Sequence, residues 1–290
     1  MTGPRPADLR AYHLRLDGRA VTLLEGPGGW GECSPLPGYP CDPAIALQAA
    51  EETARSGFPA PGRDEVRVNA LVDGPDFDPA LLAGFDAVKV KLRAPNDVDL
   101  VARVRDAVGP RVALRVDANG AFDLDTALTV IARLAGLDIE LVEQPVASLD
   151  DLAAVRRRSP VAIAADECVR TIDDARRLRS LGAADAVVLK VQPLGGVRAA
   201  LAIAEEAGVP AIATSMMETS VGLAAGLALA CALPELPYAC GLGTASLLVD
   251  DVTAEPLVAH GGRLVRRAVV PDPALLARYA VSPPSQVSTS

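Results

Sequence analysis

Five short apolar stretches of this chain each end in a charged residue, and they recur at nearly constant intervals. The terminal residues are Lys91, Asp117, Glu143, Asp166 and Lys190, and the successive intervals are 26, 26, 23 and 24 residues. An apolar run that stops at a charge is typical of a strand that is buried on both faces of a parallel sheet. Each interval leaves room for one helix. The repeat therefore predicts strand–helix units in which these five side chains occupy the same structural position.

Further apolar runs extend this repeat to eight strands. We expect strands at residues 66–72, 87–92, 112–117, 139–144, 161–166, 186–191, 210–215 and 238–243. Helical spacing predicts helices at residues 97–108, 123–135, 149–158, 172–181, 195–207 and 220–232. Capping residues precede five of them: Asn96, Asp123, Ser148, Thr171 and Thr219. Eight units of about 25 residues suit a closed (β/α) barrel, a TIM barrel of the α/β class, which takes roughly 250 residues.

An open, doubly wound sheet is the alternative architecture for such a repeat. It requires a glycine-rich phosphate-binding turn after the first strand, and residues 69–75 (NALVDGP) do not supply one. The closed barrel is therefore the preferred interpretation.

The two ends of the chain do not follow the repeat. Residues 12–16 and 21–25 predict a hairpin that turns at Asp17-Gly18. Residues 43–56 predict a helix. Residues 26–40 are so rich in Gly and Pro that we expect a surface loop, either a lid over a pocket or an ordinary connector.

These ends define the expected domain organisation. We expect residues 1–62 and 247–290 to form a small α+β capping domain together, and residues 63–246 to form the catalytic barrel. The last ten residues are rich in Ser and Pro, and we expect them to be disordered.

The composition excludes several kinds of partner. A net charge of −9 and an aromatic content of 3% argue against nucleic-acid binding, which needs a basic face or stacking surfaces. The apolar segment 222–233 covers about half of the roughly 20 residues that a membrane span needs. The five cysteines form no C-x-x-C pair, and the first thirty residues lack the apolar core of a signal peptide. We expect a cytoplasmic protein with reduced thiols.

The carboxylates of Asp117, Glu143 and Asp166 would converge at the C-terminal mouth of such a barrel. Any one of them alone is more often a helix cap or an ion-pair partner, but three in phase on successive strands favour a single site. Like charges this close raise one another's pKa, and a hard divalent cation relieves the conflict. Oxygen donors without His or Cys favour Mg²⁺, for which Mn²⁺ could substitute. The sequence therefore predicts a magnesium site.

Lysines flank this cluster from both directions of the sequence. Lys89 and Lys91 share one strand face, and Lys190 ends a strand on the opposite side of the ring. One ammonium of the pair is expected to lower the pKa of the other, so that a lysine beside the metal serves as a general base. Lys89 taken alone would be an ordinary solvated charge. The two histidines, His13 and His260, fall at no barrel strand end, and no Gly-x-Ser-x-Gly elbow is present.

The motifs around these residues resemble those of the enolase superfamily, muconate-lactonising subgroup. The segments that carry the resemblance are Lys89-x-Lys91, Val116-Asp117-Ala118-Asn119, Val142-Glu143-Gln144-Pro145, Ala165-Asp166-Glu167 and Leu189-Lys190. It covers nearly the whole chain, and residues 188–200, 218–226 and 234–243 add a narrower likeness to actinobacterial enzymes of menaquinone biosynthesis. The resemblance implies a modified barrel, (β/α)7β, that has lost its eighth helix and lies under an α+β capping domain.

A lyase reaction follows from the resemblance. It implies Mg²⁺-dependent syn elimination of water from 2-succinyl-6-hydroxy-2,4-cyclohexadiene-1-carboxylate, giving 2-succinylbenzoate. Lys91 would abstract the proton α to the carboxylate and return it to the departing hydroxide, with Lys89 beside it. Lys190 would stay protonated on the opposite face and stabilise the anionic intermediate. The expected partner is thus a small-molecule carboxylate, and we expect a monomer.

The resemblance also assigns pocket residues. Thr214, Ser215 and Gly241 match positions that line the pocket for the succinyl group. Each hydroxyl taken singly is equally well a satisfied strand-end group. Asn119 either supports the metal site or belongs to the turn after its strand.

Two alternative functions stay open from the sequence. An N-succinylamino acid racemase or dipeptide epimerase would use Lys91 and Lys190 as bases on opposite faces of its substrate, alone or beside the dehydration. A non-catalytic relative would bind a carboxylate without turning it over. Relatives often have a longer specificity loop in place of the tight turn between Leu16 and Val21, so the substrate is less constrained by the sequence than the barrel chemistry.

Overall fold

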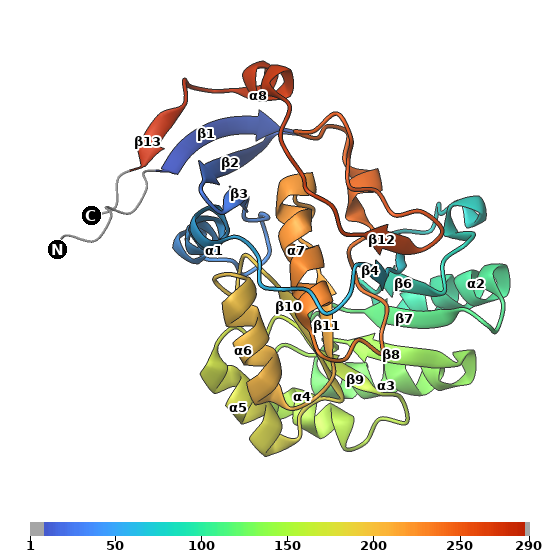
Figure 1. Cartoon of the computed structure of the whole chain (residues 1–290). Helices are drawn as coiled ribbons and strands as arrows, with labels where there is room; N and C mark the ends of the chain where they lie inside the picture. Colours follow the sequence, from blue (N-terminus) through green and yellow to red (C-terminus); the bar gives the residue numbers. More distant parts are fainter. Residues whose placement is uncertain (1–8, 288–290) are drawn as a thin grey trace.

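The structure is a computed structural model that describes residues 9–287 (Figure 1). Its centre is a sheet of seven parallel strands in the order β11-β10-β9-β8-β7-β6-β5, so each strand lies beside its neighbours in sequence. The strands are β5 Ala70–Val72, β6 Ala87–Lys91, β7 Ala113–Asp117, β8 Ile139–Glu143, β9 Ile163–Ala165, β10 Ala186–Lys190 and β11 Ala211–Thr214. The connections contain η1 Pro79–Leu82, α2 Val98–Val108, α3 Leu124–Leu134, α4 Leu149–Arg156, α5 Ile172–Leu181, α6 Val197–Ala207 and α7 Ser220–Ala232.

Residues 240–241 close this sheet into a ring. Cys240 pairs in parallel with Val68, and Gly241 pairs in parallel with Thr214. The backbone N–H of Asn69 donates to the Cys240 carbonyl at 2.9 Å. The predicted eighth strand at 238–243 is therefore reduced to two isolated bridges. The strand positions and the connections between them make the expected modified (β/α)7β barrel, with a single 3₁₀ turn in place of the first helix.

Alternation along the strands separates two sets of side chains. In β6, Val88 and Val90 are fully buried against the helices, whereas Lys89 and Lys91 occupy the positions that face the ring interior. Small and branched apolar side chains fill the lower interior: Leu141, Ala164, Ala186, Val188 and Ile212. The charged strand ends lie one step further along the same inward rows. The alternation thus gathers them at the C-terminal mouth of the ring.

The N-terminal segment forms a second sheet, which is antiparallel and lies at the upper end of the molecule in Figure 1. Its order is β13-β1-β2-β3, with β1 Leu9–Leu16, β2 Arg19–Gly26, β3 Gly29–Cys33 and β13 Ser285–Val287. The hairpin turns at Asp17 and Gly18, which have positive φ angles of 48° and 76°. Two residues of this conformation are typical of a tight hairpin turn, so that prediction is confirmed.

Helix α1, Pro43–Ser56, packs against β3. Its bounds agree with the predicted helix. The expectation of a loop throughout residues 26–40 is wrong for residues 29–33, which pair with β2 as a strand. A Cβ at Gly31 would lie 2.0 Å from the Ala50 carbonyl oxygen, so the glycine serves close strand–helix packing rather than loop flexibility.

The C-terminal tail returns to both sheets. Strand β12, Arg263–Val265, pairs with β4, Glu65–Arg67, so the predicted strand at 66–72 divides into β4 and β5. Helix α8, Pro273–Tyr279, packs on β1. Strand β13 pairs with the edge of β1 that does not pair with β2. The expectation that residues 281–290 are disordered is therefore wrong for 285–287, and residues 288–290 lie outside the described part. The division into 1–62 plus 247–290 and 63–246 stays a prediction.

Side-chain caps fix most of the barrel helices. The predicted caps whose side chains accept a backbone N–H are Asp123, Ser148, Thr171 and Thr219. Asn96 is not a cap, because it lies inside the short 3₁₀ turn η2, Pro95–Asp97, that precedes α2. Two further 3₁₀ turns are η3, Ala135–Leu137, and η4, Thr244–Leu247. None of the helices within residues 9–287 is long and apolar enough to cross a membrane.

Candidate active site

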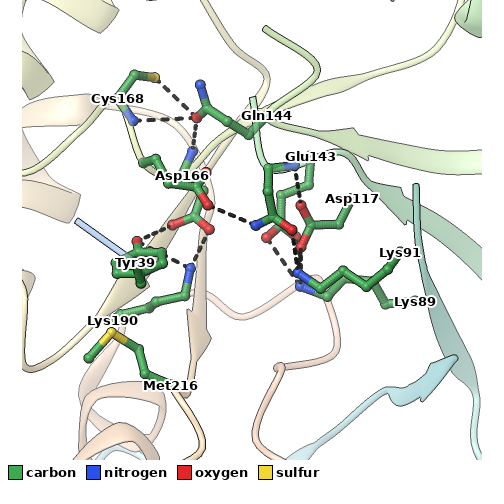
Figure 2. Close-up of polar contacts among 12 residues, drawn as sticks. Tyr39, Lys89, Lys91, Asp117, Glu143, Gln144, Asp166, Cys168, Lys190 and Met216 are labelled. Atoms are coloured by element: carbon green, nitrogen blue, oxygen red, sulfur yellow. Dashed lines mark hydrogen bonds and ion pairs between the residues drawn. The ribbon is translucent and has the colours of Figure 1, made fainter. Parts of the chain in front are cut away.

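The structure brings the six predicted charged residues together at the mouth of the barrel. Asp117, Glu143 and Asp166 are 1%, 3% and 2% exposed. Figure 2 shows Lys89 and Lys91 on one side of these carboxylates and Lys190 on the other. Strands β6 and β10 are separated by three strands of an eight-position ring, so the lysines approach from opposite sides.

Lysines hold the carboxylates through charge-assisted hydrogen bonds. Lys89 Nζ donates to Asp117 Oδ2 at 3.0 Å and to Glu143 Oε1 at 3.1 Å. Lys91 Nζ donates to Asp117 Oδ2 at 2.6 Å and to Asn119 Oδ1 at 2.7 Å. Lys190 pairs with Asp166 across the site. Bonds of this kind are stronger than neutral hydrogen bonds.

The electrostatics of the carboxylates differ from one residue to the next. Burial would raise the pKa of Asp117, but the ammonium groups of Lys89 and Lys91 outweigh it and hold that pKa well below its usual range. Burial and the nearby Asp117 charge raise the pKa of Glu143 to about 7. Burial also raises the pKa of Asp166, in spite of Lys190. Burial is the largest cause in all three cases, and the lysine ammonium groups outweigh it only at Asp117.

The lysines Lys89 and Lys190 are stabilised as cations. Burial opposes the charged form of Lys89, but Asp117 and Glu143 outweigh burial and raise its pKa. The pKa of Lys190 is raised in the same way, chiefly by Asp166. The expectation that one ammonium of the Lys89–Lys91 pair lowers the pKa of the other is therefore wrong for Lys89.

All the lysines of the chain lie in this site. The sequence contains Lys89, Lys91 and Lys190 and no other lysine, so the remaining members of its 28 basic side chains are arginines. The restriction of lysine to these three positions is visible in the sequence and points to the same site, independently of the pattern of strands.

A divalent cation, which the enolase-type motifs imply, fits the donor chemistry here. Within residues 9–287, no three His, Cys, Asp or Glu side chains form a group that could hold an ion as they now stand. Asp117, Glu143 and Asp166 each accept from a lysine instead. They are nevertheless buried oxygen donors of the kind that Mg²⁺ prefers. The donor set therefore suits a hard cation.

Amide side chains support the charged groups. Gln144, with a positive φ of 39°, accepts from the Asp166 backbone N–H at 2.6 Å. Asn119 accepts from Lys91 and donates to Glu167 Oε1 at 2.8 Å, so it orients charged side chains rather than only forming a turn. The repeat of charged residues at strand ends did not predict this role of Gln144, because Gln144 is uncharged and lies just past the end of β8.

The three predicted pocket residues lie at one edge of the mouth, where β11 meets residues 240–241. Thr214 Oγ1 is buried without a hydrogen-bond partner. A Cβ at Gly241 would lie 2.8 Å from Thr214 Cγ2, so glycine allows residue 241 to pack closely against Thr214. Ser215 Oγ instead hydrogen-bonds Thr244 Oγ1 at 2.7 Å. The Thr214 hydroxyl is thus left without a partner, whereas the Ser215 hydroxyl is engaged by the structure itself.

A barrel with carboxylates at the ends of three successive strands and lysines facing them from opposite sides is the arrangement that the enolase-type motifs of the sequence imply. A model of the family described as enolase C-terminal domain-like matches residues 78–272. The chain belongs to the enolase superfamily, and the predicted family is confirmed.

Named relatives narrow the comparison. The o-succinylbenzoate synthase of Thermobifida fusca is 51% identical over 278 residues, which cover 90% of this chain and 88% of the relative. The o-succinylbenzoate synthase of Mycolicibacterium smegmatis is 44% identical, with 92% and 85% covered. Among solved structures, the muconate lactonizing enzyme from Pseudomonas fluorescens complexed with muconolactone has a TM-score of 0.81 at 23% identity, covering 94% of this chain and 98% of that one. That structure shares the fold.

Proposed function

We propose that this chain is an o-succinylbenzoate synthase, a lyase of menaquinone biosynthesis. Its substrate would be 2-succinyl-6-hydroxy-2,4-cyclohexadiene-1-carboxylate, and its products 2-succinylbenzoate and water. The named relatives above support this substrate. The observation that carries the proposal is the convergence of every lysine of the chain on one cluster of buried carboxylates.

Lys91 is proposed as the base. Its side chain is 23% exposed, against 11% for Lys89 and 9% for Lys190, so it is the most accessible of the three lysines. Neutral Lys91 takes the proton α to the substrate carboxylate. The C–O bond to the leaving hydroxyl then breaks, and the Lys91 ammonium returns the proton to the departing hydroxide. Water and the aromatic ring are formed, and Lys91 is neutral again.

Charge compensation is assigned to the other residues. Lys190 faces the substrate from the opposite side as an ammonium and offsets the negative charge of the intermediate. Asp117, Glu143 and Asp166 would hold Mg²⁺, which when bound supplies stabilisation of the negative charge on the substrate carboxylate. Lys89 donates to both Asp117 and Glu143 and favours the ionised form of Asp117. Thr214 and Gly241 offer the edge for the succinyl group.

The cellular setting is part of the proposal. We propose a cytoplasmic enzyme, because all five cysteines are free thiols in the structure. The partner proposed for the site is a small-molecule carboxylate.

The test compares the wild type with Lys91→Ala and with Lys91→Arg as the charge-preserving control. Arginine keeps the positive charge beside Asp117 but cannot act as a base at neutral pH. Both variants are expected to lose dehydration by at least about 10²–10⁴-fold, while Mg²⁺ still binds. Turnover of Lys91→Arg within tenfold of the wild type would contradict the assigned base.

Racemisation of N-succinylamino acids is assayed in the same preparations. Fast racemisation with negligible dehydration would replace the proposed function by the racemase. The absence of both reactions in the wild type would favour a non-catalytic relative.

A further inference from the structure

Residues 34–42 form a loop between β3 and α1 that we call the lid loop. Its first residue is fixed to the barrel: Ser34 N–H donates to Gln192 Oε1 at 2.8 Å, and Gln192 Nε2 donates to Ser34 Oγ at 3.2 Å. At its far end, Asp42 accepts from Ala44 N–H at 2.8 Å and caps α1. The loop is therefore anchored at both ends and free of helix and strand between them.

Tyr39 lies in the middle of the lid loop, and its side chain contacts residues of the active site. Its hydroxyl donates to Asp166 Oδ1 at 2.9 Å. Lys190 Nζ lies 4.4 Å from the centre of the Tyr39 ring and 3.3 Å from its hydroxyl oxygen. Figure 2 shows the Tyr39 ring beside Lys190 and Asp166, away from Lys89 and Lys91. An ammonium over an aromatic face is attracted by the negative face of the ring, and more strongly when it is shielded from water.

The other side of the lid loop is not packed. A pocket of about 460 Å³ lies between Pro40, Cys41 and Asp42 and the segment around Leu194 and Gly195. From the middle of the loop, the Tyr39 side chain makes hydrogen bonds to the barrel.

The segment formed by the end of β10 and the residues just after it contacts the lid loop at two places. Gln192 follows Lys190 by two residues and binds Ser34, while Lys190 itself meets Tyr39. We propose that Tyr39 is a positioning residue, which fixes the Lys190 ammonium between its ring and Asp166 when the lid loop is closed. This inference rests on the proposed function of the same site, and it adds a residue of the N-terminal unit to the machinery of the barrel.

The distribution of lysine allows a direct test of where Lys190 lies. Protein labelled with [ε-¹³C]lysine contains three labelled side chains, and Lys190→Arg identifies the Lys190 signal. Spectra are recorded with Mg²⁺ present. The ring should displace the Lys190 methylene proton signal in the wild type and in Tyr39→Phe, which keeps the ring. In Tyr39→Leu the displacement should disappear.

A matched control removes a tyrosine hydroxyl elsewhere. Tyr12 donates to Glu25 Oε2 at 2.8 Å in the N-terminal sheet, so Tyr12→Phe loses an equivalent bond without touching the lid loop. The Lys190 signal should be unchanged in this variant. A Lys190 signal that stays in place in Tyr39→Leu overturns the proposal, whatever the activity of the protein.

Values of kcat and KM distinguish a Tyr39 that positions Lys190 from a Tyr39 that only lines the pocket. If Tyr39 positions a group that acts in the transition state, Tyr39→Leu lowers kcat by about tenfold to thirtyfold, and Tyr39→Phe lowers it less. KM should change less than kcat in both variants. A change confined to KM overturns the proposal, because Tyr39 would then be only a wall of the pocket. If the wild-type protein does not catalyse the dehydration, the proposed function is refuted separately. The lysine spectra still test whether Tyr39 positions Lys190, because they do not depend on activity.

Discussion

Replacing Glu218 by glutamine is expected to stabilise the folded protein above pH 7 and to flatten the dependence of its stability on pH. Glu218 precedes α7 and is 3% exposed. Its carboxylate accepts from Met216 N–H at 2.5 Å, a bond that a glutamine carbonyl can also accept. Burial and the neighbouring Glu32 carboxylate raise the pKa of Glu218 from 4.5 to about 7. The folded state therefore keeps this proton at pH values where the unfolded chain has lost it.

The sign and the size of the effect follow from linkage. A folded-state pKa above the unfolded value means that the folded protein binds more protons, so the unfolding free energy falls as the pH rises. The loss begins near pH 4.5 and is complete above about pH 7. Each unit of difference is worth about 1.4 kcal/mol, so the charge of Glu218 costs about 3 kcal/mol at pH 8. Glu218→Gln removes this cost and leaves the stability at pH 4 little changed.

The assay is urea unfolding of wild type and variant at several values between pH 4 and pH 8.5, with EDTA present. The difference between the two proteins is the measured quantity, because Glu143 also titrates near pH 7 and is common to both. The control is Glu235→Gln, at an exposed position, which should give no pH-dependent difference. A difference between wild type and Glu218→Gln that is constant across this range refutes the reasoning.

Two further changes test the metal ligands and the N-terminal unit. Asp166→Asn should weaken Mg²⁺ binding by about tenfold or more, measured by calorimetry, because it removes a charged donor; equal affinity would exclude Asp166 as a ligand. Gly31→Ala would force a Cβ to 2.0 Å from the Ala50 carbonyl oxygen. It should destabilise the protein by about 1–3 kcal/mol in urea unfolding, whereas Gly136→Ala, where a Cβ meets nothing within 4 Å, serves as its control.

The barrel was largely predictable because its strands are continuous apolar runs that end in charges. Seven of the eight expected strands form, six of them close to the predicted residues and the first divided in two. The eighth failed because residues 238–243 complete the ring through bridges at Cys240 and Gly241, a contact that local pattern does not encode. Strand β3 was missed for a related reason. The glycines of this segment predict a loop from the sequence, but Gly31 lies in a strand and allows helix α1 to pack closely against it.

The charged core of the site was predictable from strand phase, since period-two alternation fixes which residues face the ring. The groups that depend on the path of loops were not. Tyr39 reaches Asp166 across 127 residues of sequence, and Gln144 supports the same residue from just beyond a strand end. The pKa of Lys89 was also mispredicted, because the two carboxylates that surround it outweigh burial and the nearby Lys190 charge.

The use of lysine in this chain separates catalysis from ion pairing. Arginine makes the ion pairs outside the site, such as Arg115 with Glu140 at 2.5 Å and Arg198 with Glu52 at 2.6 Å. A guanidinium holds a carboxylate at least as well as an ammonium does, so binding alone would not require lysine at the mouth of the barrel. Lysine differs in being able to lose its proton near neutral pH when its surroundings permit. A chain that keeps lysine only where carboxylates converge therefore fits proton transfer better than carboxylate binding without turnover.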